Sequence, residues 1–188
     1  IVSDLSGYAF FYNGPKCGAS APDHMHFQAG RKEEFPVVRN WLNFRKRVVW
    51  ERGRTSLYAS AGLLPVCFIL VSGDRNEAAA VFGLLYDRMP MGPEDYEPMM
   101  NVVAWREEDV WITCIFPRRE LRPSCYYAEG DANILISPAT VEMAGLFVVP
   151  LEKDFKKVTF ADLEKVWEEV SITEDEENEL IRKIRDEV

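Results

Sequence analysis

Hydrophobic side chains along the chain follow two patterns, one typical of strands and one typical of helices. Short apolar or alternating runs bounded by glycine, proline or charged residues indicate strands. We expect strands at 7–13, 24–29, 47–51, 65–73, 100–107 and 109–117, the last two joined as a hairpin around "REED". The segment "FPVVRNWLNF" that precedes the third strand is ambiguous, and we expect irregular structure there.

Helical spacing of apolar residues follows residues that commonly cap helices. The apolar-periodic segment "EAAAVFGLLYDRM" and the charged C-terminal end are the clearest cases, and the end of the chain from about 159 to 188 reads as a helical tail. The expected starts are Asp74 with Glu77 as a capping box, Ser137 with Pro138 at the first helical position, Thr159, and Thr173 with Glu176. Strands and helices mix without strict alternation, so the pattern predicts an α+β protein.

Composition narrows the class of protein further. The chain has 188 residues, of which 47% are hydrophobic, and this suits one domain with a sizeable core. Its net charge of −9 argues against broad binding to nucleic acid or to an anionic membrane. No signal peptide or membrane-spanning run is evident, and the chain reads as cytoplasmic. The widely spaced cysteines indicate buried thiols: Cys17, Cys67, Cys114 and Cys125.

The stretch "YNGPKCGASAPDHMHFQ" contains the strongest candidates for a functional site, because it holds both histidines of the chain. On a strand, His24, His26 and Gln28 would share one face, and Met25 and Phe27 would pack into a core on the other. A neutral imidazole is a competent nucleophile near pH 7, and its attack on phosphorus would give a phosphoramidate. Gln28 would then hold a phosphoryl oxygen without adding negative charge.

The loop before this strand has the composition of a phosphate-binding loop. Gly14 and Gly18 would let backbone N–H groups approach phosphate oxygens closely. Asn13 and Ser20 offer neutral donors, and Lys16 offers a positive charge.

The pair of histidines also fits a metal site or a purely structural role. Histidines at i and i+2 of a strand are common zinc or iron ligands, but a third ligand would have to be an Asp, Glu or Cys from elsewhere. In the structural role, His24 and His26 are hydrogen-bonded residues at a strand end, and the loop before them is an ordinary turn. The residues alone leave both interpretations open.

Other polar residues are weaker candidates for phosphate binding or acid–base catalysis. Arg118 and Arg119 follow a predicted strand and would either hold a second phosphate or remain exposed to solvent. Glu120 and Glu142 are candidate acid–base groups, although surface positions account for them better. The acidic C-terminal end reads as a solvated amphipathic helix with i, i+4 ion pairs such as the one between Glu179 and Lys183.

"NGPKCGASAPDHMHFQ" resembles the N-x-G-x-x-x-G-A-S-x-x-H-x-H-x-Q signature of the histidine-triad-like nucleotide phosphorylases and transferases. These include diadenosine tetraphosphate phosphorylase, the GDP-hexose phosphorylases and, more distantly, galactose-1-phosphate uridylyltransferase. "VWITCIFPRRE" and "SPATVEMAGLFVVP" resemble later segments of these enzymes. The resemblance covers about 16 residues densely, and the chain looks like a bacterial branch of the superfamily. It implies an antiparallel sheet with flanking helices.

The resemblance also implies roles for individual residues. His26 would carry the nucleotidyl group, His24 would position it, and Gln28 would bind the phosphoryl group. The phosphate loop would be lined by Asn13, Gly18, Ala19 and Ser20. A glutamine at the third position goes with transferases and phosphorylases rather than with plain hydrolases.

Substrate and partners follow from the same resemblance. The expected substrate is a dinucleoside polyphosphate or a nucleoside-diphosphate sugar, and the one candidate cofactor is Mg²⁺ that accompanies the nucleotide. The chain starts at Ile1 and enters a strand almost at once, so we expect a single domain, or the C-terminal portion of one. A homodimer or a preceding segment would complete the nucleotide site. A degenerate module that keeps the loop but has lost turnover is the main alternative to an enzyme, and a metal-dependent enzyme is the third.

Overall fold

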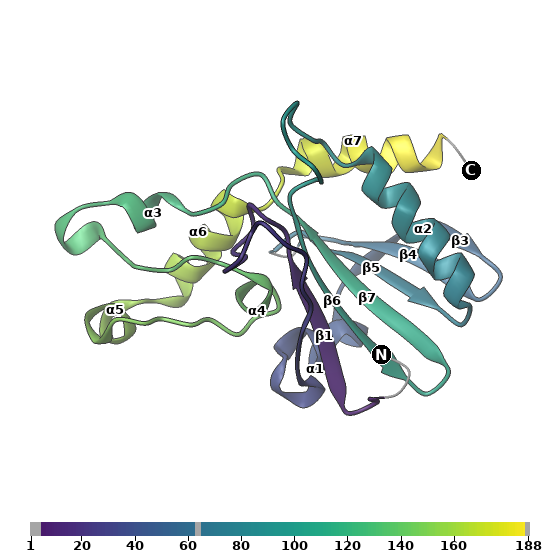
Figure 1. Ribbon diagram of the computed structural model, residues 1–188, viewed down its shortest axis with the longest axis horizontal. Helices are drawn as coiled ribbons and strands as arrows, with labels where there is room; N and C mark the ends of the chain where they lie inside the picture. The colour runs from purple at the N-terminus through teal and green to yellow at the C-terminus, as the bar shows by residue number, and fades with distance from the viewer. Residues whose placement is uncertain (1–4, 63–64, 187–188) are drawn as a thin grey trace.

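The computed structural model describes residues 5–62 and 65–186 and has an antiparallel sheet of seven strands at its centre (Figure 1). Neighbouring strands follow the order β2-β1-β6-β7-β5-β4-β3, and every pair is antiparallel. Helices flank the sheet, so the predicted α+β class is confirmed. The strands are β1 (Tyr8–Asn13), β2 (Gln28–Arg31), β3 (Lys46–Arg52), β4 (Thr55–Ser60), β5 (Phe68–Ser72), β6 (Met100–Glu107) and β7 (Val110–Pro117).

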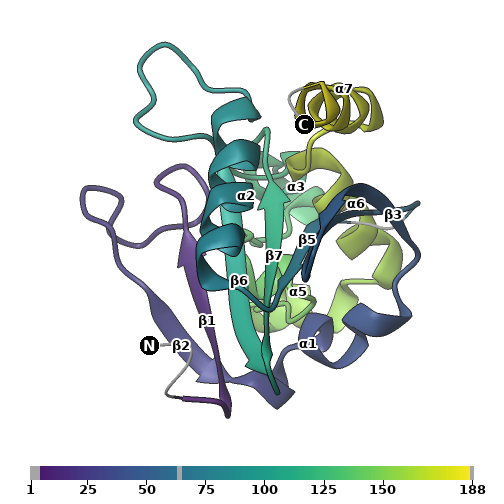
Figure 2. The same cartoon turned by 90° about the vertical axis from the view of Figure 1, so that its right-hand side faces the viewer.

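The two faces of the sheet carry different helices (Figure 2). One face packs against α2 (Arg75–Arg88) and α7 (Glu174–Arg185), with Leu57, Phe68 and Leu85 fully buried between them. The opposite face packs against α1 (Pro36–Asn40), α4 (Thr140–Met143) and α6 (Phe160–Val170), around Trp105 and other buried residues. Period-two alternation along the strands accounts for both cores, because each central strand is apolar on both sides.

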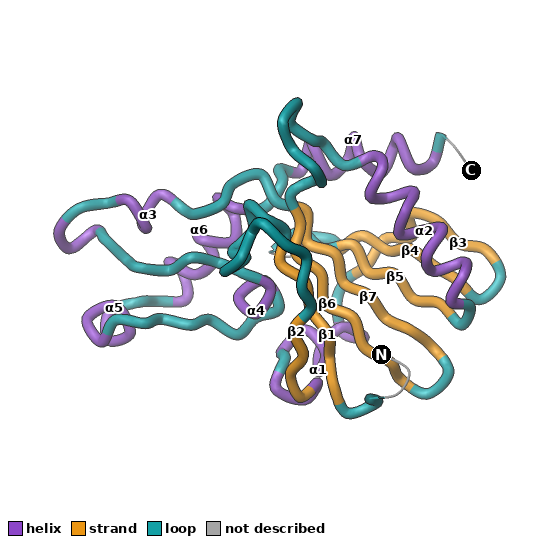
Figure 3. The backbone as a smooth tube through the Cα atoms, viewed as in Figure 1, coloured by secondary structure: helices purple, strands orange, loops and turns teal. Residues whose placement is uncertain are grey.

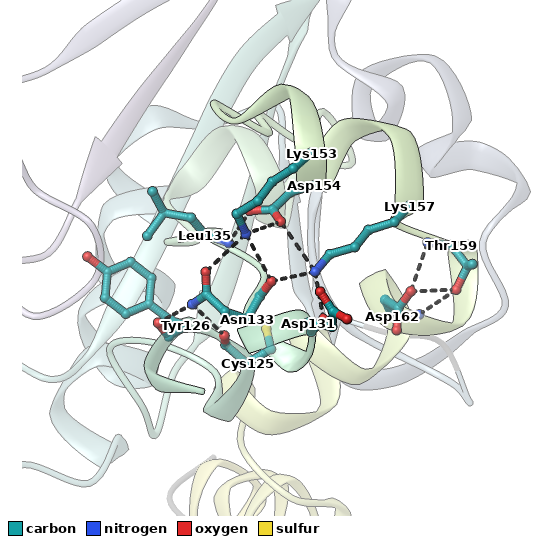
Figure 4. A network of polar contacts seen from close by, with 10 residues as sticks. All are labelled: Cys125, Tyr126, Asp131, Asn133, Leu135, Lys153, Asp154, Lys157, Thr159 and Asp162. Atoms are coloured by element: carbon teal, nitrogen blue, oxygen red, sulfur yellow. Dashed lines mark hydrogen bonds and ion pairs between the residues drawn. The ribbon is translucent and has the colours of Figure 1, made fainter. Parts of the chain in front are cut away.

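A small lobe beyond the sheet contains α3 (Ser124–Tyr127) and α5 (Glu152–Lys157), and the carboxylate of Asp154 is buried within it (Figure 4). Asp154 accepts from the backbone N–H of Leu135 at 2.8 Å and from Lys153 Nζ at 2.6 Å. Lys157 Nζ donates to the carbonyls of Asp131 and Asn133, at 2.7 Å each. These contacts fasten the loop around 131–135 to α5, and they hold the pKa of Asp154 below its ordinary value of 3.8, with the Leu135 N–H as the largest cause.

Local capping signals predicted several helices correctly. Thr159 and Thr173 accept from the N–H groups of Asp162 and Glu176, and both of these acids return a hydrogen bond to the capping residue. Asp74 caps α2, but the expected capping box is wrong. Glu77 accepts instead from Thr55 Oγ1 at 2.6 Å and pairs with Arg52, because strand β4 brings Thr55 within its reach.

Three other expectations are wrong. α4 begins after Ala139 rather than after Ser137, because the Ser137 hydroxyl accepts from Arg122 Nε at 3.0 Å. The segment expected to be irregular contains α1, which has Pro36 at its first position. The strand expected at 24–29 begins only at Gln28, and β4 has no counterpart among the expected strands.

None of the helices within the described ranges is long and apolar enough to cross a membrane. The thiols are free, as expected, and Cys17, Cys67 and Cys114 are buried while Cys125 is partly exposed.

Candidate functional site

Asn13, the last residue of β1, is the centre of the polar network at one end of the sheet. Its side chain is buried, and its Oδ1 accepts from the N–H of Thr140 and from Thr140 Oγ1, both at 2.7 Å. The same oxygen accepts from Asn101 Nδ2 at 3.0 Å. Asn13 Nδ2 donates to Gln28 Oε1 at 3.2 Å. Asn13 therefore joins β1, β2, β6 and the start of α4.

Arg118 extends this network beneath the loop. Its side chain is buried, and Nη1 donates to Asn101 Oδ1 at 2.5 Å and to the Pro138 carbonyl at 3.2 Å. The remaining N–H groups donate to the carbonyls of Val170, Glu120 and Leu121. All five guanidinium donors are thus engaged by the protein, and burial lowers the pKa of the guanidinium from its ordinary value. Arg118 lies neither in solvent nor facing the histidines, and its contacts are those of a residue that supports the loop.

Arg119 lies outside this network. It is exposed, and its guanidinium donates to the carbonyls of Glu168 and Glu169 near the end of α6. Cationic donors at a helix C-terminus complement the helix dipole. The structure gives Arg119 a capping role and does not bring it to the histidines.

The loop after β1 is fixed at its glycines and at Cys17. The N–H of Gly14 donates to the Met100 carbonyl at 3.1 Å, and the N–H of Cys17 donates to the Gly14 carbonyl at 2.8 Å. Gly18 has φ of +85°, and a Cβ at this position would lie 2.7 Å from Ala139 Cβ. Only glycine suits both this backbone conformation and this close approach. Burial raises the pKa of the Cys17 thiol to about 12, so Cys17 is a packing residue.

Three successive N–H groups of the loop remain available to a ligand. Within the described ranges, the N–H groups of Gly18, Ala19 and Ser20 donate to no other residue. Successive free N–H groups near a glycine with positive φ form the kind of concavity that binds anions. Lys16 is exposed and pairs with Asp95, so its charge is shared with a carboxylate. The N–H of Gly14, in contrast, already donates to the Met100 carbonyl, so Gly14 helps to shape the loop but offers no donor to a ligand.

The histidines do not lie on a strand, contrary to the prediction. Residues 24–27 are irregular, and the exposed fractions of Met25 and Phe27 are 69% and 64%, so neither packs into a core. Phe11 pairs with Gln28, and continuing this register would put His24 opposite Pro15.

A proline interrupts the ladder on this side of β1. Pro15 has no N–H to donate to a strand at His24. The backbone groups of Tyr12 and Gly14 face β6 instead, where the N–H of Gly14 donates to the Met100 carbonyl.

Even so, the two imidazoles lie close together, and a contact with the backbone indicates which ring nitrogen of His26 carries a proton. The ring centroids of His24 and His26 are 5.4 Å apart. His26 Nδ1 lies 3.3 Å from the His24 carbonyl, which can only accept, so Nδ1 carries the proton in this contact. In the neutral ring, the lone pair is then on Nε2 of His26. His24 Nδ1 lies 3.3 Å from Asp23 Oδ1.

Next to His24 is a polar hollow of about 200 Å³ that includes a residue pair not foreseen from the sequence. Tyr12 donates to both carboxylate oxygens of Glu97, at 2.8 and 2.7 Å. Burial and Glu97 together raise the pKa of Tyr12. Glu97 comes from the loop between α2 and β6, which lies at the same end of the sheet as the loop between β1 and β2 (Figure 3). No sequence signal marked Glu97, Asn101 or Thr140, because their contacts with Tyr12 and Asn13 span 85 or more positions.

The two glutamates considered as acid–base groups lie in different places. Glu120 is exposed. Glu142 is buried, contrary to the expected surface position, and accepts from the N–H groups of Ala139 and Val148 at 2.8 and 3.3 Å. Burial raises its pKa, and these N–H groups oppose the rise. Glu142 holds together the segment from 139 to 148 rather than facing the hollow.

A metal centre has no additional ligand nearby in the part of the chain that the structure describes. No group of three His, Cys, Asp or Glu side chains there is placed to hold a metal ion.

Comparison with known proteins yields one match, and it falls on this site. A family profile described as a domain of unknown function, DUF4922, matches residues 1–31, which contain β1, the loop and both histidines. No curated protein and no solved structure matches the chain significantly.

Proposed function

We propose that this protein is a histidine-triad-like nucleotidyltransferase or phosphorylase that acts through a nucleotidyl group carried on His26. The expected substrates are dinucleoside polyphosphates and nucleoside-diphosphate sugars. The observation that carries the proposal is the contact of Asn13 with Gln28 beside a loop of free N–H groups, in the stretch whose residues resemble the superfamily signature.

The Asn13 contact orients Gln28 for phosphoryl binding. Because Asn13 Nδ2 donates to Gln28 Oε1, the amide nitrogen of Gln28 is directed away from this contact. Its N–H groups then serve a phosphoryl oxygen, together with the N–H groups of Gly18, Ala19 and Ser20. Neutral donors suit this task because they stabilise charge that grows on the oxygens in the transition state.

The reaction proceeds in two displacements. The Nε2 lone pair of His26 attacks the phosphorus of the nucleotidyl group, a P–N bond forms, and the P–O bond to the leaving group breaks with its electron pair on oxygen. The leaving group is a nucleoside polyphosphate from a dinucleoside polyphosphate, or a sugar phosphate from a nucleoside-diphosphate sugar. An oxygen of the acceptor then attacks the same phosphorus, and the P–N bond breaks and returns its electron pair to Nε2. Mg²⁺ bound to the substrate would neutralise phosphate charge during both steps.

Turnover by matched variants tests the proposal. Diadenosine tetraphosphate, GDP-glucose and UDP-glucose are each incubated with inorganic phosphate and the protein, and product nucleotides are separated by chromatography. We expect His26→Ala to abolish turnover and Gln28→Ala to slow it by ~10²–10³. Arg39→Ala, on the exposed surface of α1, serves as the control. Full turnover by His26→Ala, or no turnover of any substrate by the wild type, would contradict the proposal.

A nucleotide-binding module without turnover is the second candidate. Its supporting observation is that His26 lies outside β2 and is fixed by one contact to its own segment. Binding of these substrates with neither product formation nor an adduct would favour it.

A further inference from the structure

An apolar groove opens on the α2 face of the sheet, beside the candidate site. Helix α2 packs mainly over β4 and β5, so it leaves β1, β6 and the outer part of β7 partly uncovered. The uncovered area and the flank of α2 enclose a hollow of about 460 Å³. Small-molecule sites in proteins commonly have volumes of ~300–1,000 Å³.

Aromatic and small side chains line this groove. The floor is formed by Phe10 and Tyr12 of β1, with Val102 and Ala104 of β6 beside them. Trp111 lies on β7, and Ala79 and Phe82 form the wall on α2. Flat aromatic walls with small residues between them favour a planar ring, because rings stack on aromatic faces and alanines leave room for them.

The groove and the polar hollow meet at Tyr12. Tyr12 lines both, and its hydroxyl reaches Glu97 at the polar end. Phe27, next to His26 in the chain, also lines the groove, and its ring centroid is 5.7 Å from that of Tyr12. Phe27 is 64% exposed, although it is a large apolar side chain. A ligand with a planar ring in the groove would therefore place its polar part beside His24 and the phosphate loop.

Arg75 supplies a cation at the end of the groove. It lines the hollow from the first turn of α2, where a positive charge opposes the helix dipole. Among the described residues it has no ion-pair or hydrogen-bond partner. Its donors are therefore available to acceptor atoms on the edge of a ring.

We propose that this groove binds the nucleobase of the substrate, stacked on Phe10, Tyr12 and Phe27, with the acceptor edge of the base facing Arg75. This inference rests on the proposed function and adds to it the place where the base is recognised. Base recognition then comes from α2 and the sheet, and phosphate recognition from the loop 14–20.

Neighbouring alanines on α2 provide a matched test. Ala79 and Ala80 are both exposed helical positions, but only Ala79 lines the groove. The binding of GMP and of ribose 5-phosphate, which lacks a base, is measured by calorimetry for the wild type, Ala79→Trp and Ala80→Trp. Because a stacked base contributes ~5- to ~150-fold to affinity, we expect Ala79→Trp to weaken GMP binding ~5-fold or more and Ala80→Trp to leave it unchanged. Ribose 5-phosphate should bind all three proteins alike.

Three results would overturn the inference: no binding of GMP, GMP binding no tighter than that of ribose 5-phosphate, or equal GMP affinity in the two alanine variants. The outcome is separable from the proposed catalysis. A protein that binds GMP in an Ala79-dependent way but forms no nucleotidyl-histidine would support the groove and contradict the catalytic proposal. Turnover by Ala79→Trp with an unaltered KM would support the catalytic proposal and contradict binding of the base in the groove.

Discussion

Asn13 and Thr140 lie 127 positions apart in the chain, and Oδ1 of Asn13 accepts hydrogen bonds from both the N–H and the hydroxyl of Thr140 at 2.7 Å. The Thr140 hydroxyl also reaches the carbonyl of Tyr12, at 2.7 Å. The first turn of α4 therefore ties down the end of β1, from which the loop 14–20 departs. The shape of that loop depends on this contact as much as on its own glycines.

Replacing Thr140 by valine should destabilise the protein by about 0.5–1.5 kcal/mol, because the change keeps the shape but removes the buried hydroxyl that bonds to Tyr12 and Asn13. Urea unfolding measures the loss. Thr113→Val is the control, since the Thr113 side chain makes no hydrogen bond within the described ranges and should change stability by less than about 0.5 kcal/mol. Equal effects of the two substitutions would show that the Thr140 contacts contribute little.

Gly18→Ala should cost more stability than Gly130→Ala. Both glycines have positive φ, +85° and +59°, so both variants carry the conformational penalty of about 1–2 kcal/mol. Only at Gly18 does the new Cβ meet another atom, Ala139 Cβ at 2.7 Å, which adds an overpacking cost of about 1–3 kcal/mol. Thermal unfolding of the two variants gives the comparison. A Gly18→Ala variant as stable as Gly130→Ala would mean that the loop can move away from α4.

Asp154 should stabilise the lobe only while it is ionised. Its pKa is below 3.8 in the folded protein, so its contribution is complete above that pH and is lost as the pH falls through the lower, folded value. The stability difference between wild type and Asp154→Asn should therefore be constant above about pH 4 and shrink in more acidic solution. Asp109→Asn, at an 86% exposed carboxylate, is the control and should show no such trend. A difference that does not change with pH would contradict this role for Asp154.

Glu142 should show the opposite slope. Burial raises its pKa above 4.5, so the folded protein keeps a proton that the unfolded chain releases, and the free energy of unfolding falls as the pH rises above 4.5. In Glu142→Gln this fall should be absent, so the stability of wild type relative to the variant should decrease as the pH rises from 4.5 through the higher, folded value. The comparison uses urea unfolding at several pH values. If the two profiles are parallel, the Glu142 carboxylate is better solvated than its buried position indicates.

What could be predicted from the sequence was mainly local. The capping boxes at Thr159 and Thr173 depend on residues three positions apart, and the β6–β7 hairpin on residues next to its turn. Such signals depend only on residues that are close together in the sequence. The expected Ser137 cap failed because Arg122, 15 positions away, engages its hydroxyl.

The candidate site was predicted in composition but not in geometry. Asn13, Gln28 and the loop do lie together, yet the strand expected at 24–27 does not form. Continuing the β1–β2 register would put His24 opposite Pro15, which has no N–H for the ladder. Arg118 was expected at the protein surface or on a phosphate, but its five donors turn inward to acceptors brought together only by the fold.

The catalytic proposal is tested most directly by the site of covalent attachment. The protein is mixed with diadenosine tetraphosphate or GDP-glucose, quenched in base, digested under alkaline conditions and mapped by mass spectrometry. A phosphorus–nitrogen bond to imidazole is expected to be stable in alkali and labile in acid, so the adduct should survive the basic quench and disappear on acidification. We expect one nucleotidyl mass on His26, retained in Gln28→Ala at a lower rate of formation and absent from His26→Ala. A nucleotidyl mass on any other residue, or an adduct that persists in His26→Ala, would contradict it.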